Sequence, residues 1–244
     1  MRIVLVALAI VLFLILFLPL YFILWIVGKF NPHAKTAASQ FVVRNAFRFT
    51  LFCAGTKITV LGRENVPKDE AVLYAANHRG FADIPVGYIT LPTLTGFVAK
   101  KEIKKVPIFS WWMKNLNCLF LDRDDMKEGL KTILTGVEHM KNGYSIFIMP
   151  EGTRNRGDEL DLLPFKEGSF KMAEKSGCAI IPVAISNSAA VFEKQIPWVK
   201  SAHVIIHYGS PIYPNSLSKD EKKHLGVTIR DNIIETLKED ASLV

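Results

Sequence analysis

The sequence predicts an α/β fold, a mainly parallel sheet flanked by helices, with an N-terminal membrane-embedded helical segment. Three observations lead to this prediction. Residues 3–27 include no charged residue, and from about residue 56 short apolar runs alternate with amphipathic stretches. The apolar runs also show little polar alternation, which is typical of parallel strands buried on both faces. We therefore expect membrane-anchoring helices over residues 1–55 and an α/β domain over residues 56–244.

The uncharged run at residues 3–27 is long enough to cross a bilayer. A continuous helix of these 25 residues would be roughly 37 Å long, which exceeds the ~30 Å hydrocarbon core. A secretory signal peptide has a shorter apolar region, so we expect the run to be retained as an anchor. Pro19 permits a kink, and a hairpin dipped into one leaflet is therefore as compatible with the sequence as a single-pass helix.

Net charge separates the two parts. Seven basic residues precede Glu64, the first acidic residue, and they account for the whole net charge of +7. A nucleic-acid-binding protein would carry its basic footprint on the folded domain, so we expect no nucleic acid partner. The basic residues that follow the apolar run predict a cell-membrane protein whose C-terminal domain lies on the cytoplasmic face.

The segment at residues 41–53 mixes phenylalanines with Arg44 and Arg48. This composition predicts a helix at the membrane interface whose cations contact anionic headgroups. An amphipathic helix packed on the folded domain would have the same pattern and is the alternative.

Seven apolar runs predict the strands of the sheet, at residues 58–61, 72–76, 95–99, 118–121, 145–149, 179–185 and 204–208. The clearest helix is at residues 124–142. Its predicted apolar face consists of Met126, Leu130, Ile133, Leu134, Val137 and Met140. Another helix is predicted to begin at a capping box formed by Ser218 and Glu221 and to continue through Leu237.

The candidate chemistry begins directly after strand 72–76, where His78 and Asp83 flank Gly80. A strand-to-helix turn can bring these two side chains together, whereas residues five apart on one helix lie about 140° out of phase. In such a turn Asp83 accepts the Nδ1–H of His78 and leaves Nε2 free as a base. A helix-capping Asp83 and a surface-exposed His78 are the alternative.

Two further strand ends carry charged residues. Gly152 and Thr153 suit a tight turn that exposes backbone N–H groups, and Arg154 suits bidentate phosphate binding. Asp122 and Arg123 follow strand 118–121, where they could also form a salt-bridged or capping pair. We expect these strand ends to form one site at one edge of the sheet.

Other chemistries lack their motifs. The sequence contains no serine hydrolase elbow, P-loop or dinucleotide-binding turn. Its three cysteines are far apart, and its histidines lack metal-ligand spacing. We expect no metal and no cofactor.

Together these pieces resemble the HX4D glycerolipid acyltransferase family, the 1-acyl-sn-glycerol-3-phosphate (lysophosphatidic acid) acyltransferases in particular. His78 and Asp83 match its first motif, His-x4-Asp. Residues 120–123 match the second, although Asn117 stands where the family often has Gly. Residues 150–154 match Phe-Pro-Glu-Gly-Thr-Arg, with Met149 in place of Phe, and residues 180–183 match an apolar strand containing proline. The four motifs occur in order within residues 72–185.

The resemblance implies a membrane-bound enzyme of phospholipid biosynthesis. Its reaction would move an acyl chain from a thioester of acyl carrier protein or coenzyme A, as co-substrate, to the sn-2 hydroxyl of lysophosphatidic acid, giving phosphatidic acid. It further implies that His78 is the general base and that Asp83 orients it. Arg123 and Arg154 would bind the acceptor phosphate.

The remaining candidates have less defined roles. Glu151 could hold the acceptor or position an arginine, and Gly152 and Thr153 could supply oxyanion N–H donors. Lys105 belongs to a basic run at residues 100–105 that could contact headgroups or an acidic carrier protein, or could be a solvated face. An acyltransferase for glycerol-3-phosphate or another lysophospholipid, and a membrane-anchored lipid-binding protein without enzymatic activity, are the alternative functions.

Overall fold

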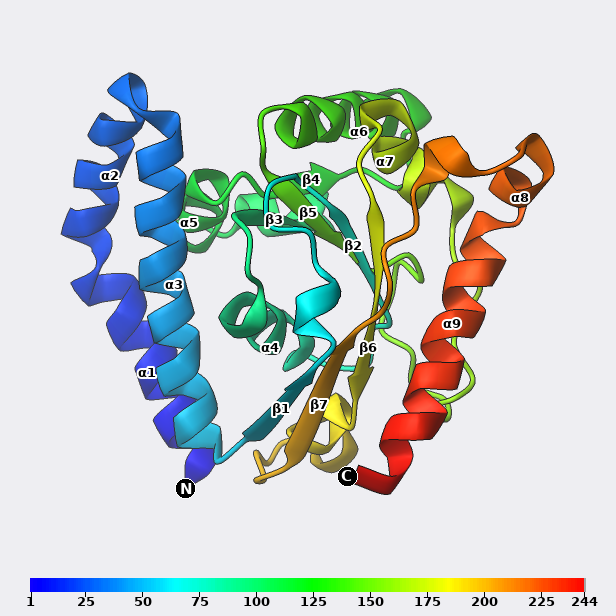
Figure 1. Ribbon diagram of the computed structural model, residues 1–244. Coiled ribbons are helices and arrows are strands. Elements are labelled where there is room, and N and C mark those ends of the chain that lie inside the picture. The colour runs from blue at the N-terminus through cyan, green and yellow to red at the C-terminus, as the bar shows by residue number, and fades with distance from the viewer. Residues whose placement is uncertain (244) are drawn as a thin grey trace.

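The computed structural model describes residues 1–243, whose strands form one seven-stranded sheet of order β1-β7-β6-β2-β5-β3-β4 (Figure 1). The strands are β1 Lys57–Leu61, β2 Leu73–Ala76, β3 Thr95–Lys100, β4 Leu119–Leu121, β5 Ser145–Ile148, β6 Ile180–Ser186 and β7 His203–Tyr208. Neighbouring strands are parallel except β6 and β7, which are antiparallel. The predicted α/β class with a mainly parallel sheet flanked by helices is confirmed, and both ends of each predicted strand lie within one residue of their observed positions.

Helices cover both faces of this sheet (Figure 1). They are α1 Arg2–Leu16, α2 Leu18–Phe30, α3 Pro32–Ala54, α4 Asp83–Thr90, α5 Phe109–Asn115, α6 Met126–Lys141, α7 Lys171–Ser176, α8 Lys219–Lys223 and α9 Leu225–Asp240. Short 3₁₀ helices include η2 Lys101–Lys105 and η5 Glu193–Gln195.

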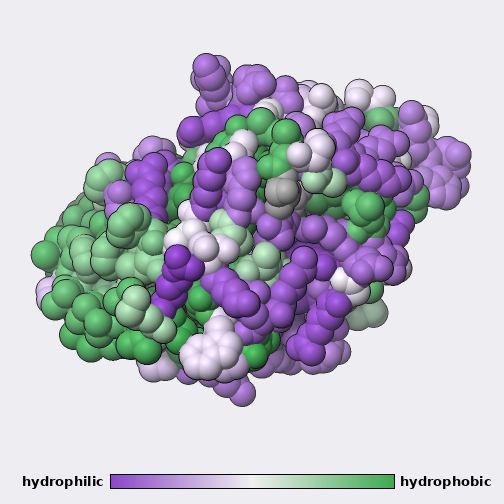
Figure 2. Space-filling view, turned by 90° about the horizontal axis from the view of Figure 1, so that it is seen from below, coloured by the Kyte–Doolittle hydropathy of each residue, from purple (hydrophilic) through white to green (hydrophobic). Residues whose placement is uncertain are grey.

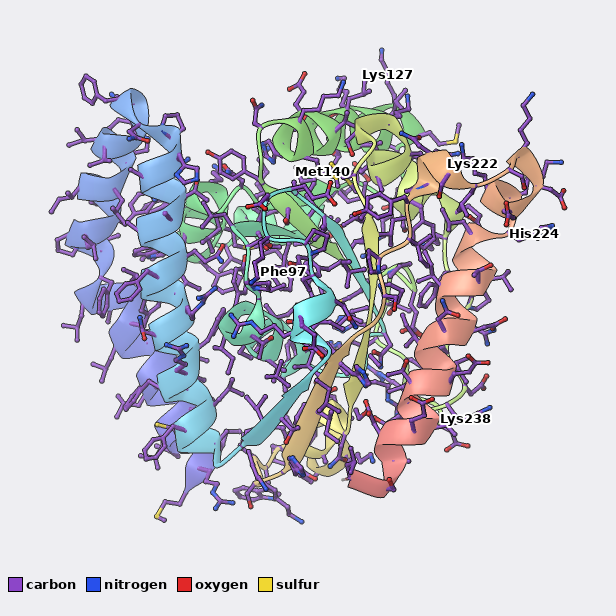
Figure 3. All side chains as sticks on the ribbon, in the orientation of Figure 1. Phe97, Lys127, Met140, Lys222, His224 and Lys238 are labelled. Carbon is purple, nitrogen blue, oxygen red and sulfur yellow. The ribbon has the colours of Figure 1, made fainter. Side chains whose placement is uncertain are left out.

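Alternate side chains of the central strands enter two apolar cores. Tyr74, which stacks on Phe147, belongs to the core beneath α3, α4 and α5. Leu73 and Ile146 belong to the core beneath α6, α7 and α9. Figure 3 labels one member of each core, Phe97 and Met140. Burial on both faces explains why the strands lack polar alternation.

The N-terminal apolar run is a bent pair of helices. The axes of α1 and α2 differ by 51°, and the break lies at Phe17, two residues before Pro19. Within residues 1–243, no single helix has both the length and the apolar character needed to cross a membrane, although the bent pair together meets that criterion by length and composition. Residues 3–27 therefore do not form one continuous helix.

Helix α3 packs along both α1 and α2 and also on the sheet domain (Figure 1). Val43 and Leu51 are buried in the core, so one face of the predicted 41–53 segment packs on the domain. Its opposite face exposes Phe41, Phe49 and Phe52. The helix therefore has both the packed face of the alternative and an exposed aromatic face.

The two arginines of α3 differ in environment. Arg44 donates from Nη2 to the carbonyl oxygen of Leu91 at 2.7 Å and from Nε to that of Tyr88 at 3.3 Å. Its guanidinium is thus bound at the C-terminal end of α4, a role that the sequence did not predict. Arg48 is exposed.

Two predicted helices differ in detail from the observed ones. In α6, Val137 and Met140 are buried, but Met126, Leu130 and Leu134 are exposed, so half of its predicted apolar face lies outside the core. The predicted capping box at Ser218 is present. The helical conformation is interrupted at His224, however, so two separate helices, α8 and α9, replace the predicted continuous helix.

Candidate active site

The candidate residues meet at the C-terminal edge of the parallel strands. His78 follows β2, Arg123 follows β4 and Arg154 follows β5. All three line one cavity of about 450 Å³. The cavity continues between apolar side chains of α1, α3 and α5, among them Phe13 and Trp112. Open α/β sheets place their sites at this edge, because the loops after parallel strands converge there.

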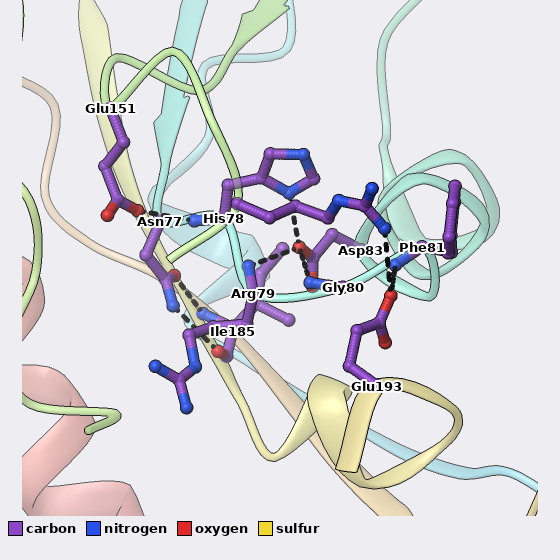
Figure 4. A network of polar contacts seen from close by, with 10 residues as sticks. Asn77, His78, Arg79, Gly80, Phe81, Asp83, Glu151, Ile185 and Glu193 are labelled. Carbon is purple, nitrogen blue, oxygen red and sulfur yellow. Dashed lines mark hydrogen bonds and ion pairs between the residues drawn. The ribbon is translucent and has the colours of Figure 1, made fainter. Parts of the chain in front are cut away.

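The turn between β2 and α4 joins His78 to Asp83 (Figure 4). His78 Nδ1 lies 2.7 Å from Asp83 Oδ2. The same oxygen accepts the backbone N–H groups of Arg79 and Gly80, each at 2.8 Å. Asp83 is fully buried at the start of α4. Three donors thus fix the carboxylate, which in turn orients the imidazole and leaves Nε2 as the nitrogen available for proton transfer.

Two buried polar side chains hold the backbone on either side of this turn. Asn77 donates from Nδ2 to the carbonyl oxygen of Ile185 at 3.0 Å and accepts its N–H at 2.8 Å, which joins the ends of β2 and β6. Glu151 Oε1 accepts the N–H of His78 at 2.7 Å, and Oε2 accepts the N–H of Leu163 at 3.0 Å. Burial raises the pKa of Glu151, although both N–H groups oppose the shift.

These contacts differ from both roles predicted for Glu151, which were to hold the acceptor or to position an arginine. Both of its oxygens are bonded to backbone donors, and it forms no ion pair with an arginine within residues 1–243. Its carboxylate fixes the position of the His78 backbone.

The two arginines reach the cavity from different loops. Arg123 donates from Nη1 to the carbonyl oxygen of Gly152. The guanidinium carbon of Arg154 lies 4.0 Å from the centre of the Phe81 ring, and its Nη1 lies 3.4 Å from Glu193 Oε1. Two cations beside one histidine make this end of the cavity suitable for a phosphate monoester.

The neighbouring Asp122 turns away from this site. It binds Lys101 at 2.7 Å, and this hydrogen bond is the main reason that the pKa of Asp122 is lowered. Within residues 1–243, Asp122 and Arg123 therefore form no salt bridge with each other, because Asp122 pairs with Lys101 and Arg123 lines the cavity.

The predicted oxyanion donors differ from each other. The Gly152 N–H donates to the carbonyl oxygen of Met149 at 2.9 Å within a turn where Gly152 has φ +74°. The prediction that this N–H serves as an oxyanion donor is therefore wrong. Thr153 lines the cavity, and its N–H forms no hydrogen bond with any residue of 1–243.

Three predicted site residues do not line the cavity, namely the buried Asp83 and Glu151 and the exposed Lys105. Lys105 lies at the end of η2, whereas Lys100 and Ile103 from the same basic run line the cavity wall. Trp112 lines the same cavity, and Trp111 stacks on Tyr21 of α2 at 5.7 Å.

The structure adds Glu193, which the sequence prediction missed. Its Oε1 accepts the Phe81 N–H at 2.7 Å (Figure 4). The same oxygen lies 3.4 Å from Arg154 Nη1. A Cβ at Gly80 would lie 2.5 Å from Glu193 Oε2, so a larger residue there would displace the Glu193 carboxylate. Glu193 belongs to the loop after β6, which is parallel to β2 and ends at the same edge. A prediction that β6 is parallel to β2 could therefore have placed the loop that contains Glu193 near His78.

Lys166 is a second addition. It lines the cavity, and its side chain lies across Gly152, where an added Cβ would be 3.0 Å from Nζ. Within residues 1–243, no group of three His, Cys, Asp or Glu residues could hold a metal ion.

A histidine held by a fully buried aspartate beside two arginines, at the edge of a parallel sheet, has the chemistry needed to move a proton next to a phosphate group. Comparison with known proteins agrees with this chemistry. The acyltransferase family model matches residues 57–186, and the chain belongs to the acyltransferase family. The matched region contains all four sequence motifs but ends before Glu193.

Curated relatives share most of the chain. The 1-acyl-sn-glycerol-3-phosphate acyltransferase of Saccharomyces cerevisiae is 32% identical over 208 residues, covering 84% of this chain and 68% of that protein. The protein of the same name from Borreliella burgdorferi is 34% identical over 200 residues, covering 82% and 79%. The crystal structure of the 1-acyl-sn-glycerophosphate acyltransferase from Thermotoga maritima superposes with a TM-score of 0.76 at 23% identity, covering 98% of this chain and 97% of that one, and therefore shares the fold.

Proposed function

We propose that the protein transfers an acyl chain from an acyl thioester to the sn-2 hydroxyl of lysophosphatidic acid, giving phosphatidic acid. The observation that carries this proposal is the 2.7 Å contact of His78 Nδ1 with Asp83, in a cavity that also contains Arg123 and Arg154. The names of the yeast and Borreliella relatives support the same acceptor. The donor would be a thioester of acyl carrier protein or coenzyme A.

The acceptor hydroxyl itself is the nucleophile in this reaction. His78 Nε2 takes the hydroxyl proton as the oxygen bonds to the thioester carbonyl carbon. Asp83 holds the Nδ1–H and stabilises the imidazolium that forms. When the C–S bond breaks, the departing thiolate takes the proton from Nε2. The products are an ester and a free thiol, and His78 is returned to its neutral form.

The two ends of the cavity match the two parts of such a substrate. Arg123 and Arg154 provide planar guanidinium groups for the acceptor phosphate. Beyond His78 the wall is apolar, and Ile10, Phe13 and Leu14 of α1 contribute to it. An acyl chain can therefore extend from the reacting carbon toward the N-terminal helices. The free Thr153 N–H is the remaining candidate donor to the oxyanion.

We further propose that α1 and α2 insert into the cytoplasmic leaflet of the cell membrane. Seen from below, hydrophobic surface gathers on the side formed by the N-terminal helices (Figure 2). Both helices pack along α3 beside the domain, an arrangement that supports insertion into one leaflet better than a single pass. Because α1 also lines the cavity, the acyl chain of a membrane-resident acceptor would have a short path to His78.

His78→Ala and Asp83→Asn test the proposed chemistry. We expect each variant to lose at least about a hundredfold in kcat, because general base catalysis contributes roughly 10²–10⁴-fold. Release of free thiol from an acyl thioester, measured with and without lysophosphatidic acid, provides the assay.

His224→Ala is the matched control, because His224 is exposed at the far side of the molecule (Figure 3). Wild-type rates in folded His78→Ala would rule out the proposed base. Thiol release that does not depend on the acceptor would indicate a thioester hydrolase. No thiol release by the wild type with any lysolipid would favour a lipid-binding protein.

A further inference from the structure

A second cavity, of about 420 Å³, lies between α2, α3 and α5. Within residues 1–243 it shares no lining residue with the cavity at His78. Its wall combines three cations with three aromatic side chains, namely Lys29, Lys35, Lys114, Tyr21, Trp25 and Trp111. Neither the sequence motifs nor the matched family region includes Lys29, Lys35, Tyr21 or Trp25.

The three lysines have no counter-charge of their own. None of them forms a salt bridge with a carboxylate of residues 1–243, and α2 and α3 contain no acidic residue. Lys35 is half-buried, and this burial lowers the pKa of its ammonium group. A Cβ at Gly28 would lie 2.5 Å from Lys35 Cδ, so the missing side chain makes room for the lysine stem. Three like charges around one cavity favour a bound anion.

A neutral hydrogen-bond donor accompanies these charges. Asn115 lines the cavity and is only 3% exposed. Its Nδ2 has no hydrogen-bond partner within residues 1–243. A buried amide without a partner costs free energy, which a ligand oxygen at this position would recover.

The aromatic side chains indicate that this anion lies at a membrane surface. Lys29 Nζ lies 4.1 Å from the centre of the Trp25 ring, and Tyr21 stacks on Trp111 at 5.7 Å. Phe22 and Ile26, on the same helix as Trp25, are exposed. Amphipathic rings beside lysines and exposed apolar side chains are typical of the headgroup level of a membrane.

We propose that this cavity binds the phosphate-containing headgroup of an anionic phospholipid, whose acyl chains lie against the exposed apolar side chains of α2. A soluble phosphate has no apolar part that could contact these side chains, whereas a phospholipid has acyl chains that could. The site rests on the proposed membrane attachment and adds a lipid preference to it. It would hold the enzyme on anionic membranes without contacting the reacting groups.

Binding to vesicles tests this site. In Lys29→Gln/Lys35→Gln/Lys114→Gln, we expect partitioning onto phosphatidylcholine vesicles that contain phosphatidylglycerol to fall at least about tenfold, because each lysine near an anionic surface contributes roughly fivefold. Binding to pure phosphatidylcholine vesicles should stay at the wild-type level. Thiol release in detergent micelles should also be unchanged, which verifies the fold.

The matched control is Lys127→Gln/Lys222→Gln/Lys238→Gln. It removes the same charge from positions far from the N-terminal helices (Figure 3), and we expect it to bind both vesicle types like the wild type. Lys35→Met keeps the buried stem, and we expect it alone to weaken binding several-fold on anionic vesicles only.

Several results would overturn the site. Equal losses in the two triple variants would show diffuse attraction instead of a site, and unchanged binding in the first triple variant would remove it. Displacement from anionic vesicles by inorganic phosphate at constant ionic strength would identify a soluble phosphate as the occupant. Failure of the wild type to bind any vesicle would instead contradict the membrane attachment on which the site rests.

Discussion

At the residue scale, one carboxylate oxygen organises the candidate site. Asp83 Oδ2 accepts three hydrogen bonds, one from His78 Nδ1 and two from the backbone N–H groups of Arg79 and Gly80 in the intervening turn. The turn therefore cannot change shape without losing bonds to a fully buried carboxylate. An unpaired buried charge is costly, so the geometry of the His–Asp pair is fixed before any substrate binds.

A second carboxylate, Glu193, holds the outer side of the same turn and competes for Arg154. Its contact with Arg154 is loose, at 3.4 Å, and Phe81 independently supports the guanidinium. Removal of the charge should therefore free Arg154 for phosphate without displacing it.

We expect Glu193→Gln to lower the KM for lysophosphatidic acid by up to about fivefold with little change in kcat, because such an ion pair contributes about 1 kcal/mol or less. Glu193→Ala also removes the acceptor of the Phe81 N–H and should lower kcat. Steady-state kinetics with varied acceptor measures both effects, and Arg154→Ala, which should raise the same KM, is the reference. Unchanged KM values in both Glu193 variants would exclude the competition.

At the element scale, α3 connects α1 and α2 to the helix that begins at Asp83. It packs on α1, α2 and α4, and Arg44 binds two carbonyl oxygens near the end of α4. Since α4 begins at Asp83, the packing of α3 supports the helix that supplies the buried carboxylate.

Arg44→Met should lower the free energy of unfolding by about 1–3 kcal/mol, because two carbonyl oxygens lose a charged donor. Arg48→Met is the control, since Arg48 is exposed one turn further along and forms only a 3.4 Å contact with Asn45. Urea denaturation monitored by circular dichroism compares the two variants. Equal stabilities would show that Arg44 does not anchor α4.

The element scale also shows where a periodic pattern misleads. Six apolar residues of α6 share a face in the sequence, yet Met126, Leu130 and Leu134 extend beyond the core that buries Val137 and Met140. Periodicity identifies the apolar side of a helix, but the extent of the sheet beneath the helix determines how many turns are buried.

At the scale of the whole molecule, the N-terminal helices belong to the same core as the sheet. Leu24 of α2 and Val43 of α3 lie in one cluster with Tyr74 and Phe147 of the central strands. Truncation of these helices would therefore expose the core and destabilise the fold, in addition to any effect on membrane binding. Substitutions on the exposed face of α2 separate the two effects.

We expect Ile23→Asn/Ile26→Asn/Phe30→Asn to reduce binding to phosphatidylcholine vesicles more than about tenfold, because burial of each large apolar side chain contributes roughly 1.5–3 kcal/mol. All three side chains are exposed on α2. Met126→Asn/Leu130→Asn/Leu134→Asn, on the exposed face of α6, is the control and should bind like the wild type. Vesicle co-sedimentation measures both. Full binding by the α2 variant would contradict the proposed attachment.

The sequence by itself determined the strands, the fold class and the identity of the motif residues. Strand positions follow from local apolar runs, and the convergence of His78, Arg123 and Arg154 follows from the rule that parallel strands end at one edge. These inferences need only residues that are close in the chain, together with one general property of parallel sheets.

Only the tertiary structure decided how the supporting residues are used. Glu151 binds the backbone of His78, Glu193 reaches the turn from the loop after β6, and Arg44 binds the end of α4. Each contact joins segments tens of residues apart, and the hydrogen-bond partners of a buried polar group depend on which segments pack around it. For the same reason the two apolar helices bend at Phe17 and lie along α3, an arrangement that the uncharged run of residues 3–27 could not specify.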